Sequence, residues 1–140
     1  DIFNKIAGIQ DIVCSNTSYS SDLKWMSDDS SLKNKYILSI NSTERKIKYS
    51  NYEKNYFGVP KVVISLGRYP YPYNDYKGEY GLSCYNFGIV IKTQSEGDNL
   101  IKCINSTKFL DLLKHNKWGS YNIEWRMFKY FRPDFYLEFI

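Results

Sequence analysis

Residues 58–92 decide the fold, and they read GVPKVVISLGRYPYPYNDYKGEYGLSCYNFGIVIK. Two short runs rich in β-branched residues, 59–66 and 87–91, stand at the ends of this stretch, and their composition and length predict buried strands. The loop between them contains Pro70 and Pro72, which restrict the backbone, and three glycines, which permit sharp turns. A stiff loop held between two strands is a common location for a binding surface.

The composition of the chain is that of a folded domain. Of its 140 residues, 43% are hydrophobic and 24% are charged, which excludes a disordered chain. At this length we expect a single domain over 1–140. Its parts are a poorly readable segment at 1–35, strands with a tyrosine-rich loop at 36–93, and a helical part at 95–140. The sequence begins without Met, which leaves open that it is a fragment of a longer protein.

The positive charge lies in the middle of the chain. Residues 44–92 contain eight Lys or Arg and four acidic residues, so this segment carries the whole net charge of +4. It also contains nine of the 14 tyrosines. A basic and aromatic segment is typical of a surface for a polyanion, nucleic acid first. A modest positive charge is also common on an ordinary solvated sheet face, and composition alone slightly favours that plainer interpretation.

The residues before the central stretch predict a β-hairpin after a less regular start. The apolar spacing at 1–13 is near a helical repeat, although a strand is also possible there, and 14–21 is expected to be a loop. Strands are expected at 36–40 and 44–49. Alternation along the second of them predicts two faces, one with Arg45, Ile47 and Tyr49 and the other with Lys46 and Lys48.

After Thr93 the pattern changes to helices. Ser95 is the expected N-cap of a first helix, and 105–106 separates it from a second helix that ends near 115–117. A third helix is expected from Asn122 to the residue before Pro133. Strands followed by two to three C-terminal helices indicate an α+β domain with a mixed or antiparallel sheet.

No catalytic motif stands out in the sequence. The three cysteines have no metal-ligand spacing, and the single histidine, His115, lies near a predicted helix end, where a C-cap role is the simpler interpretation. One weak alternative is a small metal-dependent nuclease, because such an enzyme needs spaced carboxylates beside a lysine. Its candidate residues are Asp75, Glu79 and Lys77.

The remaining chemistry is recognition. Tyrosine and tryptophan faces stack on bases, whereas Lys and Arg bind phosphates or base edges. The loop at 68–85 is expected to enter a DNA groove, with its tyrosines on one side if 68–74 is extended. The candidate DNA-binding residues are Lys46, Lys48, Arg68, Tyr69, Tyr71, Tyr73, Lys77, Lys117 and Trp118. Two alternatives stay open: half of the tyrosines pack against the sheet, or they form the flat surface of a protein- or glycan-binding β-rich module.

Four segments share a pattern with one known family. They are YILSINSTERKIKYS at 36–50, PKVVISLGR at 60–68 with GEYGLSCYNFGIVIK at 78–92, NLIKCINSTKFLDLLKHNKW at 99–118, and NIEWRMFKYFRPDF at 122–135. With these segments, from about Lys35 onward, the chain resembles the C-terminal target-recognition region of adenine-specific N6 DNA methyltransferases, including those fused to restriction enzymes. That family typically has an LNSKLF-like helix junction, and this chain has INSTKF at 104–109.

The resemblance implies a DNA-reading part without catalytic activity of its own. In that family the recognition domain clamps double-stranded DNA against a separate catalytic domain, which carries a cofactor-binding glycine loop and an Asn-Pro-Pro-aromatic motif for the flipped adenine. Neither motif occurs in this chain. S-adenosylmethionine would bind the methyltransferase catalytic domain, in the same or a partner chain, and no cofactor is expected here.

The expected location is intracellular, in the cytoplasm. The sequence has no signal peptide and no apolar run of about 18 residues, so no membrane contact is expected.

Overall fold

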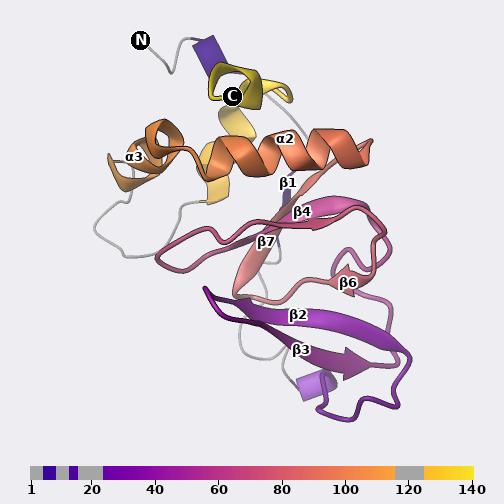
Figure 1. Cartoon of the computed structure of the whole chain (residues 1–140). Helices are drawn as coiled ribbons and strands as arrows, with labels where there is room; N and C mark the ends of the chain where they lie inside the picture. Colours follow the sequence, from indigo (N-terminus) through magenta and orange to yellow (C-terminus); the bar gives the residue numbers. More distant parts are fainter. Residues whose placement is uncertain (1–4, 9–12, 16–23, 116–124) are drawn as a thin grey trace.

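The computed structural model describes residues 5–8, 13–15, 24–115 and 125–140, and it confirms the predicted α+β fold. Figure 1 shows the elements in layers, with the helices at the top of the view, a first sheet beneath them and a second sheet at the bottom. The predicted helix or strand at 1–13 lies largely outside the described residues.

The first sheet has four strands and is antiparallel throughout. Its order is β1 (Val13–Ser15), β7 (Asn86–Val90), β4 (Lys61–Ser65) and β5 (Tyr73–Asp75). The two predicted buried strands are β4 and β7, and they pair with each other, Val62 opposite Ile89. The prediction of a loop from residue 14 onward is wrong at its start, because Cys14 pairs with Gly88. This partner, distant in the sequence, gives a polar segment the hydrogen bonds of a strand.

The second sheet has three strands and is mixed. Its order is β3 (Arg45–Ser50), β2 (Asn34–Ile40) and β6 (Tyr80–Gly81). β2 and β3 form the predicted antiparallel hairpin, with a β-bulge after Ile37, whereas β6 runs parallel to β2. At the bulge the Leu38 carbonyl accepts a hydrogen bond of 2.6 Å from the Ser83 hydroxyl, and the Asn86 amide donates to the Ile37 carbonyl at 3.0 Å. These bonds fasten the second sheet to the start of β7.

The stretch between β4 and β7 is not the single loop that the sequence predicted. It contains β5, which pairs with β4 and places Tyr73 opposite Val63, and β6, which pairs with β2 and places Tyr80 opposite Lys35. Strands of three and two residues are too short to give a readable alternation, so the pairing partners decide their structure. The stretch is therefore divided into separate turns at both ends of β5.

β4 is buried on both faces and separates two hydrophobic cores. Val62 and Ile64 face the helices and belong to the larger core, which also contains Leu100 of the first helix. Val63 faces the second sheet, where it packs with Ile37 and Leu82. Successive side chains of a strand point to opposite faces, so one strand serves both cores. The expectation of a buried strand is confirmed, because all five of its residues are buried.

Two α-helices follow the sheets, as predicted, and Figure 1 shows α2 lying across the first sheet. α2 (Gln94–Ile104) is capped by Thr93, whose side-chain oxygen accepts the Glu96 N–H at 3.0 Å. The expected N-cap at Ser95 is therefore wrong, because the backbone leaves the extended conformation directly after Thr93. α3 (Thr107–His115) follows the expected break, and the Ser106 hydroxyl accepts the Phe109 N–H at 3.2 Å.

The C-terminal residues form two 3-10 helices, one within the segment where the sequence predicted a third helix and one after Pro133. They are η2 (Trp125–Tyr130) and η3 (Phe135–Glu138). The rings of Phe128, Phe131 and Phe135 all pack against Phe109, with centroid distances of 5.8–6.3 Å. The short 3-10 helices and the turn between them therefore place three aromatic rings in one core. The expected cap Asn122 lies outside the described residues. Among the helices in the described ranges, none has the length and apolar character needed to cross a membrane.

Candidate nucleic-acid interface

The turn after β4 is a stiff platform that carries exposed side chains. The Ser65 N–H donates to the Pro70 carbonyl at 2.8 Å, and the Leu66 N–H donates to the Tyr85 carbonyl at 3.0 Å. Pro70 is buried, whereas Arg68 and Tyr69 are exposed. The backbone of this turn is thus fixed to the sheet while its side chains face outward.

Tyr71 changes the direction of the chain within this turn. Its φ is 39°, a left-handed conformation that is uncommon for a bulky residue and strained where it occurs. The segment 68–74 is therefore not extended throughout, so the condition under which its three tyrosines would share one direction is not met. The ring of Tyr71 lies 6.0 Å from the ring of Tyr69, centroid to centroid. We call Arg68, Tyr69, Tyr71 and Tyr73 the tyrosine ridge.

Tyr73 is half-buried, at the boundary between the smaller core and the surface. It packs against the smaller core, and its ring meets that of Tyr80 edge to face at 5.9 Å. The Arg45 guanidinium lies over its ring, 3.9 Å from the centroid. Burial raises the pKa of the Tyr73 hydroxyl, and the charge of Arg45 opposes that rise. The expectation that some tyrosines pack against the sheet is confirmed for this one.

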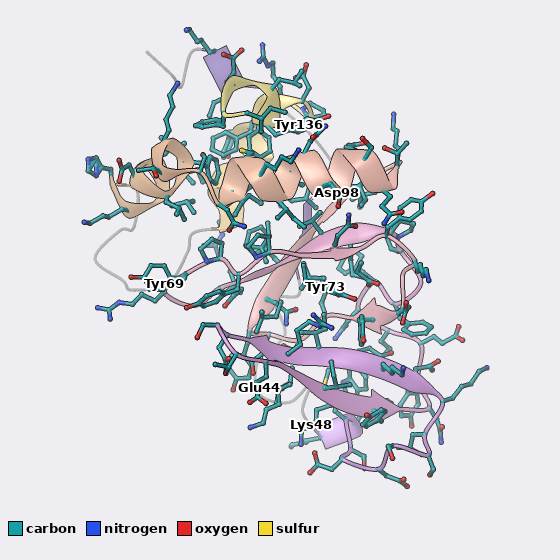
Figure 2. The ribbon with its side chains drawn as sticks, in the orientation of Figure 1. Glu44, Lys48, Tyr69, Tyr73, Asp98 and Tyr136 are labelled. Atoms are coloured by element: carbon teal, nitrogen blue, oxygen red, sulfur yellow. The ribbon has the colours of Figure 1, made fainter. Side chains whose placement is uncertain are left out.

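A hollow lies on each side of the tyrosine ridge. The first has a volume of about 440 Å³ and is lined by residues 40–45 of the hairpin, by 71–73 and by Asn105. The second has a volume of about 640 Å³ and lies between 68–70 and the outer side of α3, including Lys114. Figure 2 shows Tyr69 projecting on the side of the molecule where Glu44 marks the hairpin turn. Hollows of this size suit small groups such as a base or a sugar.

Lys46 and Lys48 lie on the other face of the hairpin. Arg45 covers Tyr73 and Ile47 packs against the smaller core, so the next residues along β3 point outward, as the alternation predicted. Lys46 is exposed. Lys48 forms an ion pair of 2.7 Å with Asp28, and its hydrogen bond and charge lower the pKa of that carboxyl. The hairpin therefore separates these two lysines from the tyrosine ridge, which lies on its other face.

The other predicted site residues are not gathered at the tyrosine ridge. β4 and β5 are antiparallel, so Lys77, in the turn after β5, lies at the opposite end of β4 from Arg68. Five strand residues separate those ends by roughly 13 Å. Lys77 is exposed. Lys117 and Trp118 lie outside the described residues.

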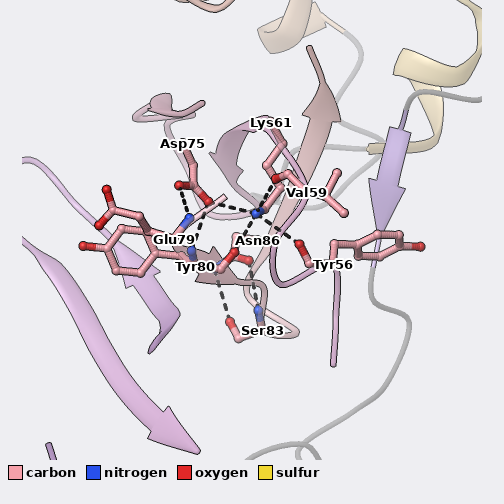
Figure 3. A network of polar contacts seen from close by, with 8 residues as sticks. All are labelled: Tyr56, Val59, Lys61, Asp75, Glu79, Tyr80, Ser83 and Asn86. Atoms are coloured by element: carbon pink, nitrogen blue, oxygen red, sulfur yellow. Dashed lines mark hydrogen bonds and ion pairs between the residues drawn. The ribbon is translucent and has the colours of Figure 1, made fainter. Parts of the chain in front are cut away.

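The acidic residue that the nuclease alternative needs is buried in an ion pair. The Lys61 side chain is 0% exposed and its ammonium lies 2.9 Å from the Asp75 carboxylate, whose side chain is 2% exposed (Figure 3). The same carboxylate accepts the Glu79 N–H at 2.8 Å and the Tyr80 N–H at 3.2 Å. Both oxygens of Asp75 are thus engaged in holding the turn. Within the described ranges no group of three or more His, Cys, Asp or Glu is placed to hold a metal ion.

Sequence reasoning missed the roles of three basic residues that the structure makes prominent. Arg45 lies on the face of β3 that Ile47 shares, as the alternation predicted, but nothing in the sequence indicated that its guanidinium covers Tyr73 at the edge of the first hollow. Lys61 begins an apolar run and gave no sign of its buried partner, which lies 14 residues further along the chain. Lys114, at the end of α3, lines the second hollow, and only its place in the last turn of a helix could have suggested exposure.

Comparison with known proteins gave no relative. The chain was compared with models of protein families, with curated proteins and with solved structures, and nothing matched in any of the three. The class defined by fold and surface is an α+β domain with a basic and aromatic ridge.

Proposed function

We propose that this chain is a sequence-specific, DNA-binding target-recognition domain that works beside an adenine N6 methyltransferase catalytic domain. The observation that carries the proposal is the tyrosine ridge between two hollows, a stiff turn in which Arg68 and Tyr69 are exposed and the other two tyrosines are half-buried. Arg45 lines the first hollow, and Arg68 and Lys114 line the second. Aromatic faces together with cations are the usual chemistry of a nucleic-acid surface.

Each part of the surface has a distinct task in this proposal. Arg68 and Lys114 bind phosphates at the second hollow, where their two positive charges outnumber the one carboxylate, Asp111, that also lines it. The rings of Tyr69 and Tyr71 contact sugars or base edges. Lys46 and Lys48 follow the backbone from the outer face of the hairpin. S-adenosylmethionine and the reacting adenine belong to the catalytic domain, in the same or a partner chain.

Duplex binding across a salt series tests the proposal directly. Fluorescence anisotropy with a labelled pool of random duplex DNA should give an affinity that falls steeply as salt rises, because each phosphate contact releases counterions. Arg68→Ala should lower the slope of log affinity against log salt by about 0.9. Unchanged affinity and slope in this variant would remove the tyrosine ridge from the interface.

Lys33→Ala is a matched control for the loss of one positive charge. Lys33 is exposed, 3.9 Å from Glu53, and precedes β2, so it lies roughly 20 Å from the hairpin turn at 41–44. Its removal should leave the slope of log affinity against log salt unchanged. Binding that does not depend on salt, to a protein or a glycan in place of DNA, would instead support a β-rich binding module.

A further inference from the structure

We propose that Arg45 reads a guanine base, with the first hollow receiving the edge of a G·C pair. This inference rests on the proposed function and names a residue outside the predicted set. It begins with the guanidinium of Arg45, which lies 3.9 Å from the centroid of the Tyr73 ring. In the part of the chain that the structure describes, the Arg45 side chain has no hydrogen-bond or ion-pair partner, so its N–H donors, which lie in the guanidinium plane, can serve a ligand.

Tyr73 holds the guanidinium in one place. The backbone of Tyr73 pairs with Val63 in the first sheet, and its ring rests edge to face on Tyr80 at 5.9 Å. Among the described residues Arg45 has no ion-pair partner. A planar fork that is fixed and has no carboxylate partner loses little conformational entropy when it binds two acceptors side by side.

The wall of the hollow that faces Tyr73 is the hairpin turn at 41–44, and its backbone is also held by hydrogen bonds. The Asn41 side-chain oxygen accepts hydrogen bonds from the Thr43 N–H at 2.9 Å and the Glu44 N–H at 3.0 Å, and the Asn41 N–H donates to the Glu44 carbonyl at 3.0 Å. This turn closes a two-stranded ribbon, a shape that the major groove of DNA admits. Figure 2 places Glu44 at this turn and Tyr73 between the two sheets.

The charges around the hollow favour a base edge over a phosphate. Two ligands could offer paired acceptors to Arg45, the O6 and N7 atoms of guanine or the oxygens of a phosphate. Glu44 lines the same hollow, so a phosphate would bring a second negative charge beside its carboxylate. A guanine edge is neutral, and the Glu44 carboxylate can accept from the N4 amino group of the paired cytosine.

Selection of binding sites from random duplex DNA, followed by sequencing, tests the role of Arg45. Wild-type protein should select a site with at least one required G·C pair, and Arg45→Ala should reduce the preference at that pair about 10-fold. Lys46→Ala is the matched control, since it removes the same charge from the adjacent residue on the outer face. It should weaken all sequences equally and leave every base preference intact.

A modified base then identifies the acceptor atoms. Replacing the required guanine by 7-deazaguanine removes its N7 acceptor, so the affinity of the wild-type protein should fall about 10-fold, equivalent to about 1.4 kcal/mol. Arg45→Ala should bind the modified and the unmodified DNA with equal affinity. If Arg45→Ala keeps every base preference and instead lowers the slope of log affinity against log salt by about 0.9, Arg45 binds phosphate and the inference is wrong. If wild-type protein selects no sequence, the proposed function fails first, and the inference fails with it.

Discussion

Replacement of Lys61 by methionine should be the most damaging single change in the first sheet. The ammonium of Lys61 has three N–H donors and lies within hydrogen-bond distance of four oxygens: Asp75 at 2.9 Å and the carbonyls of Tyr80 at 2.5 Å, Val59 at 3.1 Å and Tyr56 at 3.3 Å. Methionine fills a similar volume but donates nothing. Lys61→Met thus leaves a carboxylate buried without its partner ion and three carbonyls without this donor.

The size of the effect follows from the cost of an unpaired buried charge. Breaking a buried ion pair by removing one partner costs about 3–5 kcal/mol, whereas domains of this kind are stable by about 5–15 kcal/mol. Lys61→Met should therefore remove about a fifth of the free energy of unfolding if the domain is at the stable end of that range, and nearly all of it at the other end. Lys77→Met is the control, because Lys77 is exposed in the neighbouring turn, and its effect should stay within about 0.5 kcal/mol.

Urea denaturation followed by circular dichroism measures these free energies. The double variant Lys61→Met/Asp75→Asn should be less damaged than the sum of its single variants, because it buries no charge. A loss below about 1 kcal/mol for Lys61→Met would refute the reasoning, since it would mean that the carboxylate finds another partner or water when Lys61 is gone.

Three further changes test other features by the same unfolding measurement. Gly81→Ala places a Cβ 2.1 Å from the buried ring of Tyr36 and should cost about 3 kcal/mol, whereas Gly67→Ala meets only the Ser65 hydroxyl at 3.2 Å and should cost less than about 1 kcal/mol; equal losses would contradict the packing argument. Tyr71→Gly should be more stable than Tyr71→Ala by about 0.5–1 kcal/mol, because glycine tolerates the left-handed backbone, and the reverse order would argue against strain there. Burial raises the pKa of the Cys103 thiol from 9.0 to about 12. As the pH rises, the thiol of the unfolded chain therefore loses its proton before the thiol of the folded chain does. The stability contributed by the protonated thiol is present below pH 9 and is lost towards pH 12. The advantage of the wild type over Cys103→Ala should shrink across that range, and a constant difference would exclude this titration.

The parts of the fold that depend on local pattern could be predicted from the sequence. The β-branched runs of β4 and β7 predicted buried strands and the alternation of β3 predicted its two faces, because each of these strands has five or six residues and its own composition can be read. The break at 105–106 was also foreseen, since Ser106 is a residue that favours helix starts.

The features that sequence reasoning missed depend on partners far away in the chain. β5 and β6 exist because β4 and β2 lie beside them, and Cys14 belongs to a strand because Gly88 pairs with it. The candidate site was foreseen in part: the tyrosine ridge follows from local composition, but the position of Arg45 over Tyr73 requires the two sheets to be packed together. A basic residue in a strand gives no local sign of the ring that it will cover.

The two faces of β4 make it a partition between the layers of the molecule. Val62 and Val63 are adjacent in sequence, yet Val62 supports the aromatic and helical layer and Val63 supports the hairpin beneath the first hollow. A change that reshapes the hairpin side, such as repacking around Val63, therefore reaches the helices through the backbone of this strand and through the bonds that join the second sheet to the start of β7. The proposed recognition side can thus vary in its own small core while the aromatic core on the other face of β4 keeps its separate set of packed residues.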